Sequence, residues 1–485
     1  MYTTPSKFRC SNSDVNQTIS WKMLSADQCE EIFVTAAEVL ERSGAVVESE
    51  EARKIFAENG CWVDGDIVRI PSAKSEWALR TAPSRVTLCN KEGKRALLLE
   101  TQNVHLGPCT GAEKVVDRKS GEPRDIKLAD VEDAARLMEA LNNIEFAALP
   151  GLPTDVPEHK NILAGLKALL TYTTKPVVLP VCCGKVAEKA IDMAAAAVGG
   201  KDNLRHNPYL ILSIECSEAR YHDEYAMSAV IAAAKAGVPF VYQNKLVAGD
   251  TAPATPAGTL VVALANTIVA VLLAQFVAEG APVIAGGKFT FYDEAHEAVP
   301  FGAPEGGLIS AGFANLMNYC KLPSAVDSGI TDAASTDMQA GVELAMGLLP
   351  TGLSGVNLLG CAQIESGKQY SDGYLAMADE VMGVIYRIMK SFEVDEDHLA
   401  CGVYDTVEPG GAYLGEDHTN VFFKSEQFWP NLITRKRIED WMAEGSKTLG
   451  QRSLEYVDTI LAKPGVSTLN DAAAAKIDEI FAAAE

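Results

Sequence analysis

A regular alternation of apolar and helical segments constrains the fold of this chain more than any other feature. Continuous apolar runs are typical of parallel strands that are buried on both faces of a sheet. The runs are TQNVHLG (101–107, the weakest), NIEFAALP (143–150), PVVLPV (176–181), YLILSIE (209–215), PFVYQ (239–243), PVIAGG (282–287), PSAVDS (323–328) and GVNLLG (355–360). Seven or eight such units predict an α/β fold, a (β/α)8 TIM barrel.

An open, doubly wound sheet is the main alternative to a barrel. No G-x-G-x-x-G sequence follows any of the runs, so a dinucleotide-binding fold has little support. Helical patterns separate the runs, at residues 128–141, 157–172, 185–198, 223–236, 256–278, 305–320 and 336–349. We therefore expect three regions: an N-terminal α+β extension (1–100), the barrel (101–400), and a C-terminal loop and helical extension (401–485).

One helical segment, 256–278, has no charged residue and is about as long as a membrane span. Its flanks, Asp250 and Glu279, are acidic, whereas membrane spans are commonly flanked by Lys or Arg. A helix that is apolar all round also occurs in protein interiors and at subunit contacts. We predict no membrane association, and the segment is one reason to expect a homo-oligomer.

Composition excludes several partners. The formal net charge of −23 over 485 residues disfavours nucleic acid and anionic lipid surfaces. Eleven cysteines, an odd number spread thinly, indicate free thiols in a reducing compartment. The N-terminus is polar and lacks a secretion signal. We predict a cytoplasmic protein, and the absence of a Walker loop or a G-x-S-x-G elbow argues against phosphoryl transfer and serine hydrolysis.

Candidate site residues follow from the barrel, because its ligands bind at the carboxyl ends of the strands. The residues at or just past these ends are rings, amides and carboxylates: Tyr242, Gln243, Asn244, Glu215, Phe289, Phe291, Tyr292, Asp327 and Gln363. Aromatic faces with a carboxylate suit a quaternary ammonium ion. The alternative for each of them is structural, a core ring or a helix cap.

A metal-dependent barrel enzyme is a second possibility, with scattered ligands such as Cys182, Cys216 and His222. The chain has no C-x-x-C or H-E-x-x-H motif to support it. We therefore expect no bound metal.

Long ordered stretches of the chain resemble the trimethylamine methyltransferase superfamily, in particular its members without pyrrolysine. They include LSADQCEEIFVTAAEVLERSGAVV, DIKLADVEDAARLMEALNNIEF, VAGDTAPATPAGTL, FGAPEGGLISAGFANLMNYCKLPSAVDSGITDAASTDMQAG and EPGGAYLGEDHT. Ala333 to Thr336 fall roughly where the founding member carries pyrrolysine. Many relatives carry a histidine after the last barrel strand, where this chain has Gly360, Cys361 and Gln363.

The resemblance implies an enzyme that moves an N-methyl group from a quaternary amine, such as glycine betaine, proline betaine or carnitine, to Co(I) of a cognate corrinoid protein. The cobalamin would belong to that partner, and no cofactor would be tightly bound here. No catalytic residue is assigned, because catalysis would consist of positioning. The rings would form the walls, the amides would hold a carboxylate or hydroxyl, and Asp327 or Glu215 would favour the cation. A betaine-binding barrel without turnover is the alternative.

Overall fold

A closed barrel of parallel strands forms the centre of the molecule. The computed structural model describes residues 21–483. The barrel strands are β6 (His105–Pro108), β9 (Ala147–Ala148), β10 (Val177–Pro180), β11 (Leu210–Cys216), β13 (Phe240–Ala248), β14 (Val283–Phe291), β15 (Ser324–Ile330) and β16 (Leu358–Ile364). β6 pairs in parallel with β16 on one side, and a bridge between Leu106 and Ile144 joins it to the chain entering β9 on the other. The predicted barrel is confirmed.

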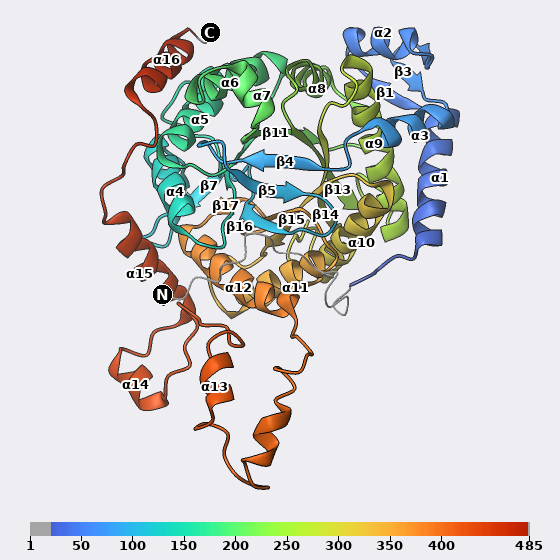
Figure 1. Cartoon of the computed structure of the whole chain (residues 1–485). Coiled ribbons are helices and arrows are strands. Elements are labelled where there is room, and N and C mark those ends of the chain that lie inside the picture. The colour runs from blue at the N-terminus through green and yellow to red at the C-terminus, as the bar shows by residue number, and fades with distance from the viewer. Residues whose placement is uncertain (1–20, 484–485) are drawn as a thin grey trace.

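Helices surround the strands as a ring, which Figure 1 shows along the barrel axis. They are α4 (Leu128–Ala140), α5 (Asn161–Tyr172), α6 (Gly184–Ala197), α8 (Glu224–Ala236), α9 (Pro256–Val277), α10 (Pro304–Cys320), α11 (Met338–Leu353) and α12 (Asp372–Lys390), with the short α7 (Lys201–His206) after α6 and the 3-10 turn η1 (Glu158–Lys160) before α5. Sequence signals for caps agree with the structure. Thr255 caps α9 ahead of a proline in the first turn, and Gly237 ends α8 in the left-handed conformation.

The N-terminal unit covers α9. It consists of α1 (Ala26–Arg42), β1 (Ala45–Val47), α2 (Glu50–Glu58), β2 (Trp62–Asp64), β3 (Ile67–Arg69) and α3 (Ser72–Thr81). Its strands form a small sheet with β12 (Tyr221–His222), and α1, α2 and α3 all contact α9. α9 is long and apolar enough to cross a membrane, but 83% of its apolar window is buried. Burial on both sides, by the barrel and by this unit, explains why the helix is apolar all round.

A β-hairpin closes the amino end of the barrel. Strands β4 (Val86–Cys89) and β5 (Arg95–Leu99) pair in antiparallel fashion, and they cross the opening nearest the viewer in Figure 1. Their apolar side chains form one cluster with side chains from the barrel interior: Val86, Leu88, Leu97, Leu99, Phe146, Ala148, Val178, Ile211, Val241, Ile284, Ala325 and Leu358. The side chains of the hairpin therefore fill the barrel interior at its amino end. The hairpin comes before residue 100 in the sequence, although it packs on the barrel. The division of the chain into regions at residues 100 and 400 stays a prediction.

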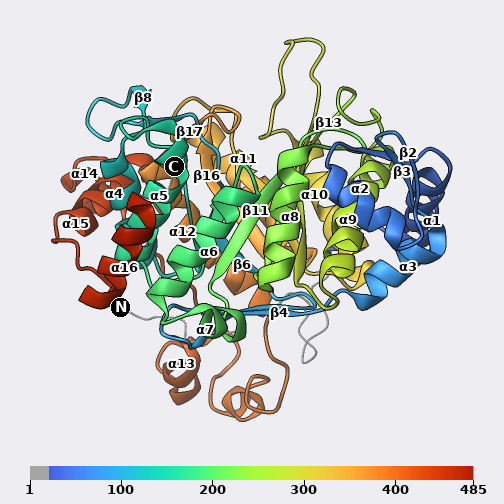
Figure 2. The ribbon, with the colours of Figure 1, turned by 90° about the horizontal axis from the view of Figure 1, so that it is seen from above.

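The carboxyl end carries a second small β-structure. β7 (Lys114–Val116) and β8 (Pro123–Asp125) form a hairpin after β6, and β17 (Gln369–Tyr370) joins β7 to the end of β16. Figure 2 shows β8 and β17 on the side of the barrel opposite β4.

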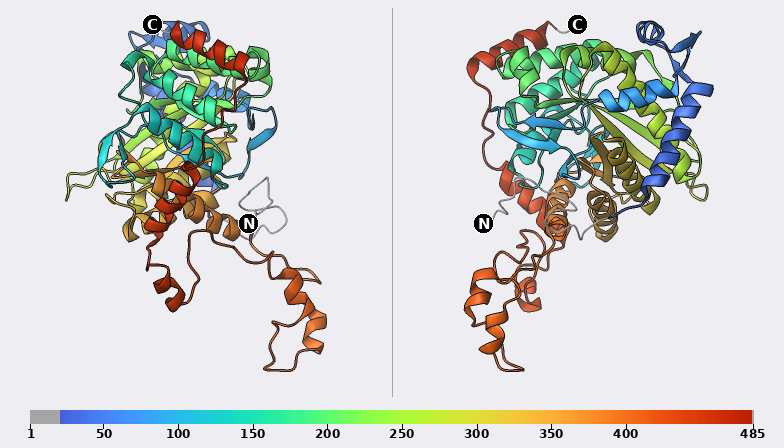
Figure 3. Two further views of the ribbon diagram at one scale, coloured as in Figure 1. Left: turned by 90° about the vertical axis from the view of Figure 1, so that its left-hand side faces the viewer. Right: turned by 45° about the vertical axis from the view of Figure 1, so that its right-hand side comes forward.

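The C-terminal region returns to the barrel after a long excursion. η2 (Cys401–Asp405), α13 (Asp417–Phe422) and α14 (Ile438–Ala443) lie away from the ring, while α15 (Leu449–Leu461) packs on α12 and α4, and α16 (Asp471–Ala482) on α6 and α5. None of residues 391–425 is buried. Figure 3 shows this segment projecting from the body.

Candidate active site

The inner face of the barrel at its carboxyl end is set by strand alternation. β13 and β14 run to Ala248 and Phe291, several residues beyond the apolar runs that predicted them. Successive side chains of a strand point to opposite faces. Val241 lies in the barrel interior, so Gln243 shares its face and Tyr242 points the other way.

A cavity lies directly above the apolar cluster that fills the barrel. The hollow encloses about 370 Å³ of space between atoms, part of which is open solvent. Its lining consists of Pro108, Cys109, Thr110, Phe146, Val178, Ser213, Val241, Gln243, Ala325, Asp327, Leu358 and Gly360. The lower wall is apolar, and the polar groups come from residues nearer the carboxyl ends of the strands.

Asp327 places a carboxylate in this cavity. Gln243 Nε2 donates to its Oδ2 at 3.3 Å, and the Cys109 thiol also hydrogen-bonds the carboxylate. Burial raises the pKa of Asp327, and the ammonium of Lys288 opposes that shift. A cation bound beside Asp327 would favour the ionised form further. Gly360, across from Asp327 in the β15–β16 register, leaves the space that the carboxylate occupies.

Lys288 carries a positive charge on the same inner face. It lies two residues after Gly286, on the same face of β14, and Gly286 pairs with Gln243 in the β13–β14 register. Its Nζ donates to Gln363 Oε1 at 3.1 Å and lies 4.8 Å from the centre of the Phe301 ring. Gln363 is fixed in turn, because its Nε2 donates to the carbonyl of Thr110 at 2.9 Å.

Glu215 lies at the mouth but not in the cavity. Its side chain is 56% exposed and forms an ion pair of 3.7 Å with Lys245 Nζ. Ser217 Oγ donates to the same carboxylate at 2.6 Å. Exposed ion pairs of this kind are weak, and we leave Glu215 out of the candidate site.

The structure does not bring Tyr242, Asn244 and Phe289 to the cavity. Tyr242 is fully buried behind the sheet, where its hydroxyl lies 2.6 Å from His222 Nδ1. Asn244 Nδ2 donates to the carbonyl of Gly286 and to Thr267 Oγ1. The Phe289 ring packs on Phe313, with 5.1 Å between ring centres. The continued strand alternation turns all three toward the helices, which corrects their sequence-based assignment.

The remaining predicted rings are also not part of the cavity wall. Phe291 ends β14 and Tyr292 follows it, and both are half-buried. The aromatic ring that does line the cavity is Phe146, which follows the short strand-entry bridge at Ile144. The cavity is thus lined by one carboxylate, one amide, two hydroxyls and a thiol above mainly aliphatic walls with one ring, and it is not an aromatic cage.

Sequence reasoning missed Lys288, Cys109, Thr110 and Phe146. Lys288 could have been found by extending the PVIAGG strand and applying its period of two, which places Ile284, Gly286 and Lys288 on one face. Cys109 and Thr110 follow the weakest of the apolar runs, so the end of that strand attracted no attention.

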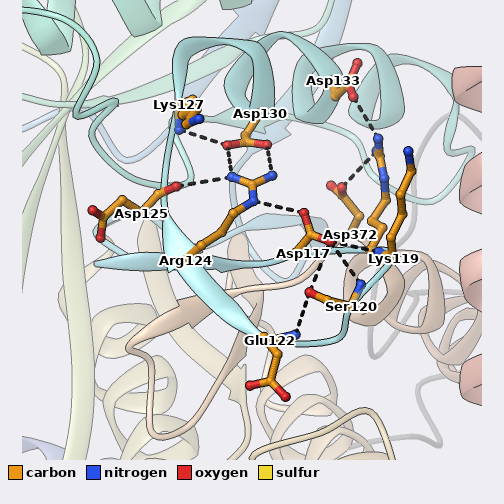
Figure 4. A network of polar contacts seen from close by, with 11 residues as sticks. Asp117, Lys119, Ser120, Glu122, Arg124, Asp125, Lys127, Asp130, Asp133 and Asp372 are labelled. Atoms are coloured by element: carbon orange, nitrogen blue, oxygen red, sulfur yellow. Dashed lines mark hydrogen bonds and ion pairs between the residues drawn. The ribbon is translucent and has the colours of Figure 1, made fainter.

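Ion pairs hold the β7–β8 hairpin beside the cavity wall that Cys109 and Thr110 form. Arg124 contacts both oxygens of Asp130 at 2.7 Å and Asp117 at 3.0 Å. Arg118 links Asp133 on α4 to Asp372 at the start of α12. Figure 4 shows that these contacts fasten the hairpin to α4 and α12. The network lies beside the site and contributes no side chain to the cavity.

The proposed metal ligands do not form a group. Within residues 21–483, the cluster that could hold a metal is Glu393, Asp395 and His398, on the projecting segment. Cys216 and His222 are buried beside Tyr242, while Cys182 is exposed. No observation on these residues favours the metal-dependent alternative.

Comparison with known proteins gives the family. The family model described as trimethylamine methyltransferase (MTTB) matches residues 5–484. The chain belongs to this family.

Relatives in the trimethylamine methyltransferase family include two proteins of Desulfitobacterium hafniense. Trimethylamine methyltransferase MttB of strain DSM 10664 / DCB-2 is 31% identical over 433 residues, which is 89% of this chain and 87% of the relative. Glycine betaine methyltransferase of strain Y51 is 29% identical over 467 residues, 95% and 97% of the two chains. The chain is accordingly a methyltransferase, as its sequence predicted.

A solved structure shares the fold. The crystal structure of Methanosarcina barkeri monomethylamine methyltransferase (MtmB) superposes with a TM-score of 0.53 and 13% identity, covering 95% of this chain and 93% of that one. At this identity the likeness supports the barrel architecture alone.

Proposed function

We propose that the chain transfers an N-methyl group from a quaternary amine of the betaine type to Co(I) of a separate corrinoid protein. The observation that carries this proposal is the buried carboxylate of Asp327 in a cavity that is otherwise apolar or uncharged. A carboxylate in such surroundings is stabilised by a cation. A quaternary nitrogen provides that cation at every pH and donates no hydrogen bond.

The cavity can orient a trimethylammonium group. Its lower wall consists of Phe146, Val178, Val241 and Leu358, which suit methyl groups. Gln243 and Asp327 lie above, so one methyl would point toward the open mouth. Positioning of this kind is the main catalytic contribution when no proton has to move.

The reaction balances without a proton donor in this chain. The bond between nitrogen and one methyl carbon breaks, and its electron pair stays on nitrogen, which leaves as a neutral tertiary amine. The methyl group goes to cobalt, whose electron pair forms the new bond in an in-line displacement. A tertiary amine would need activation before it could lose a methyl group in this way, whereas a quaternary one does not.

The mouth of the cavity faces the carboxyl rim, which is where we expect the corrinoid protein to dock. The glycine betaine methyltransferase relative is consistent with a betaine-type substrate. We include a cytoplasmic location in the same proposal, on the cysteine content and acidic charge of the chain. A homo-oligomeric state also stays a proposal, although α9, which led us to expect it, is already covered by the N-terminal unit of the same chain.

A methyl-transfer assay tests the proposal. Purified protein, the reduced cognate corrinoid protein and a quaternary amine are mixed, and loss of the Co(I) absorbance is followed together with the mass of the amine. We expect the amine to lose one methyl group as Co(I) is consumed. Unchanged absorbance and mass with glycine betaine, proline betaine, carnitine and choline would contradict it.

A further inference from the structure

Two opposite charges lie next to each other on the inner face of the barrel without forming an ion pair. The last registered pair of β14 and β15 joins Gly287 to Val326. Lys288 and Asp327 come next on the two strands, so they are cross-strand neighbours on the inward face. Within residues 21–483 neither side chain takes part in an ion pair, although their charges interact.

Separate amides hold the two charges. Asp327 accepts from Gln243 Nε2 at 3.3 Å, and Lys288 Nζ donates to Gln363 Oε1 at 3.1 Å. Gln363 is itself anchored to the Thr110 carbonyl. Each charge is therefore hydrogen-bonded to a different amide.

Other neighbours of Lys288 also direct its ammonium. Phe301 presents its ring at 4.8 Å, and Gly367 leaves open space where a side chain would crowd Nζ. A cation beside a ring is attracted to the negative face of the ring. The ammonium is thereby positioned beside the mouth of the cavity, not folded onto Asp327.

Unpaired, partly buried charges of opposite sign are costly unless something compensates them. A ligand that carries both charges would compensate both at once. Its cation would meet Asp327 and its anion would meet Lys288.

We propose that Lys288 is the residue of this site that binds the carboxylate of a betaine substrate. This inference rests on the proposed function and adds to it the residue that recognises the anionic end of the substrate. A ligand with the cation alone would leave Lys288 uncompensated. The structure thus assigns Lys288 as the residue that separates betaines from choline-like or simple tetraalkylammonium ions.

Binding measured by calorimetry tests this without the corrinoid protein. The probes are glycine betaine, a homologue with one further methylene, and tetramethylammonium. Wild-type protein should bind the better betaine more tightly than tetramethylammonium. Lys288→Met should weaken betaine binding by roughly 10- to 100-fold, the value of a hydrogen bond to a charged group, and should leave tetramethylammonium binding within about 3-fold.

Two variants serve as controls. Lys288→Arg keeps the charge and should retain most of the preference for the betaine. Lys245→Met removes the lysine that pairs with Lys288 in the β13–β14 register but contacts Glu215, and it should change neither affinity by more than about 2-fold. Thermal unfolding checks that each variant folds. If Lys288→Met does not fold, Lys288→Gln is measured in its place.

The outcomes separate the two proposals. Equal weakening of both probes by Lys288→Met, or no preference for the betaine in the wild type, overturns the role of Lys288. If methyl transfer from choline is as efficient as from betaines, the preference for betaines that we assign to Lys288 is overturned, but the proposed function is not. Absence of both binding and methyl transfer with every quaternary amine overturns the proposed function and this inference with it.

Discussion

The two ends of the barrel use the same strands for opposite purposes. At the amino end the β4–β5 hairpin packs Leu88 and Leu97 against Val241 and Ile284, and the space is filled. Two or more residues further along the strands the inward positions become Gln243, Lys288 and Asp327, and a cavity opens. Filling gives stability, while an unfilled polar end costs stability and creates a place for a ligand.

This contrast makes separate predictions for the two ends. Changes in the hairpin cluster should lower the free energy of unfolding with little effect on affinity. Changes in the cavity should alter substrate affinity or turnover with little effect on unfolding.

The largest effect on stability is expected at the amino end. Leu97→Ala removes a buried side chain from the hairpin cluster and should lower the free energy of unfolding by roughly 2–5 kcal/mol. The KM for the substrate should stay within about 2-fold. Denaturant unfolding and steady-state assays measure both, and Arg95→Ala, at the exposed start of the same strand, should cost less than about 0.5 kcal/mol.

The reverse pattern is expected for Asp327→Asn. The substitution keeps the shape of the side chain and removes its charge, so kcat/KM for methyl transfer should fall by roughly 100-fold, about 2.7 kcal/mol, within the range for losing one partner of a buried charge pair at a binding site. The free energy of unfolding should stay equal or rise slightly, because burial raises the pKa of Asp327. Glu215→Gln, at the exposed mouth, is the control and should change kcat/KM by less than about 3-fold; a similar loss in both would contradict the assignment.

A smaller effect is expected for Tyr242→Phe. The change removes the hydroxyl that hydrogen-bonds His222 Nδ1 and should lower the free energy of unfolding by about 1–2 kcal/mol. Methyl transfer should be unaffected, since the ring faces the helices. A variant with normal stability and reduced affinity would instead support the original sequence-based role of Tyr242.

The smallest effect is expected on the pH dependence of the unfolding free energy, through Asp372. Burial raises the pKa of Asp372 to about 6, with Arg118 opposing the shift. The folded state thus binds this proton more tightly than the unfolded state. The resulting stabilisation is complete below about pH 4 and is lost as the pH rises through 6.

Comparison with Asp372→Asn isolates this slope. Relative to that variant, the wild type should lose at least about 1 kcal/mol of unfolding free energy between pH 4 and pH 7. Chemical unfolding of both proteins at several pH values measures the difference. A difference that is constant with pH would contradict the raised pKa.

The sequence predicted the architecture well because βα repetition is local. Helix caps such as Ser25 and Thr255, and the turn at Gly65, act through their immediate neighbours, and the family resemblance agreed with the pattern. The closure of the barrel by the β4–β5 hairpin could not be predicted from local patterns, because it depends on contacts between residues far apart in the chain.

The candidate site was harder to predict, for a physical reason. Apolar runs mark the buried part of a strand and not its end, so the segments predicted for β13 and β14 are shorter than the observed strands. The prediction that Tyr242, Gln243 and Asn244 all line the mouth is incompatible with a strand, because successive side chains of a strand point to opposite faces. The structure brings Gln243 to Asp327 and Gln363 to Lys288. The binding roles of Asp327, Gln243 and Gln363 stay predictions, and the sequence pattern did not single out Lys288.

The orientation of a bound betaine is the most direct measurement of this account. In a crystal structure of the complex with glycine betaine, the trimethylammonium group should lie against Asp327 inside the barrel, with the carboxylate on Lys288 Nζ and one methyl toward the mouth. A ligand bound outside the barrel, or with its carboxylate turned away from Lys288, would contradict it.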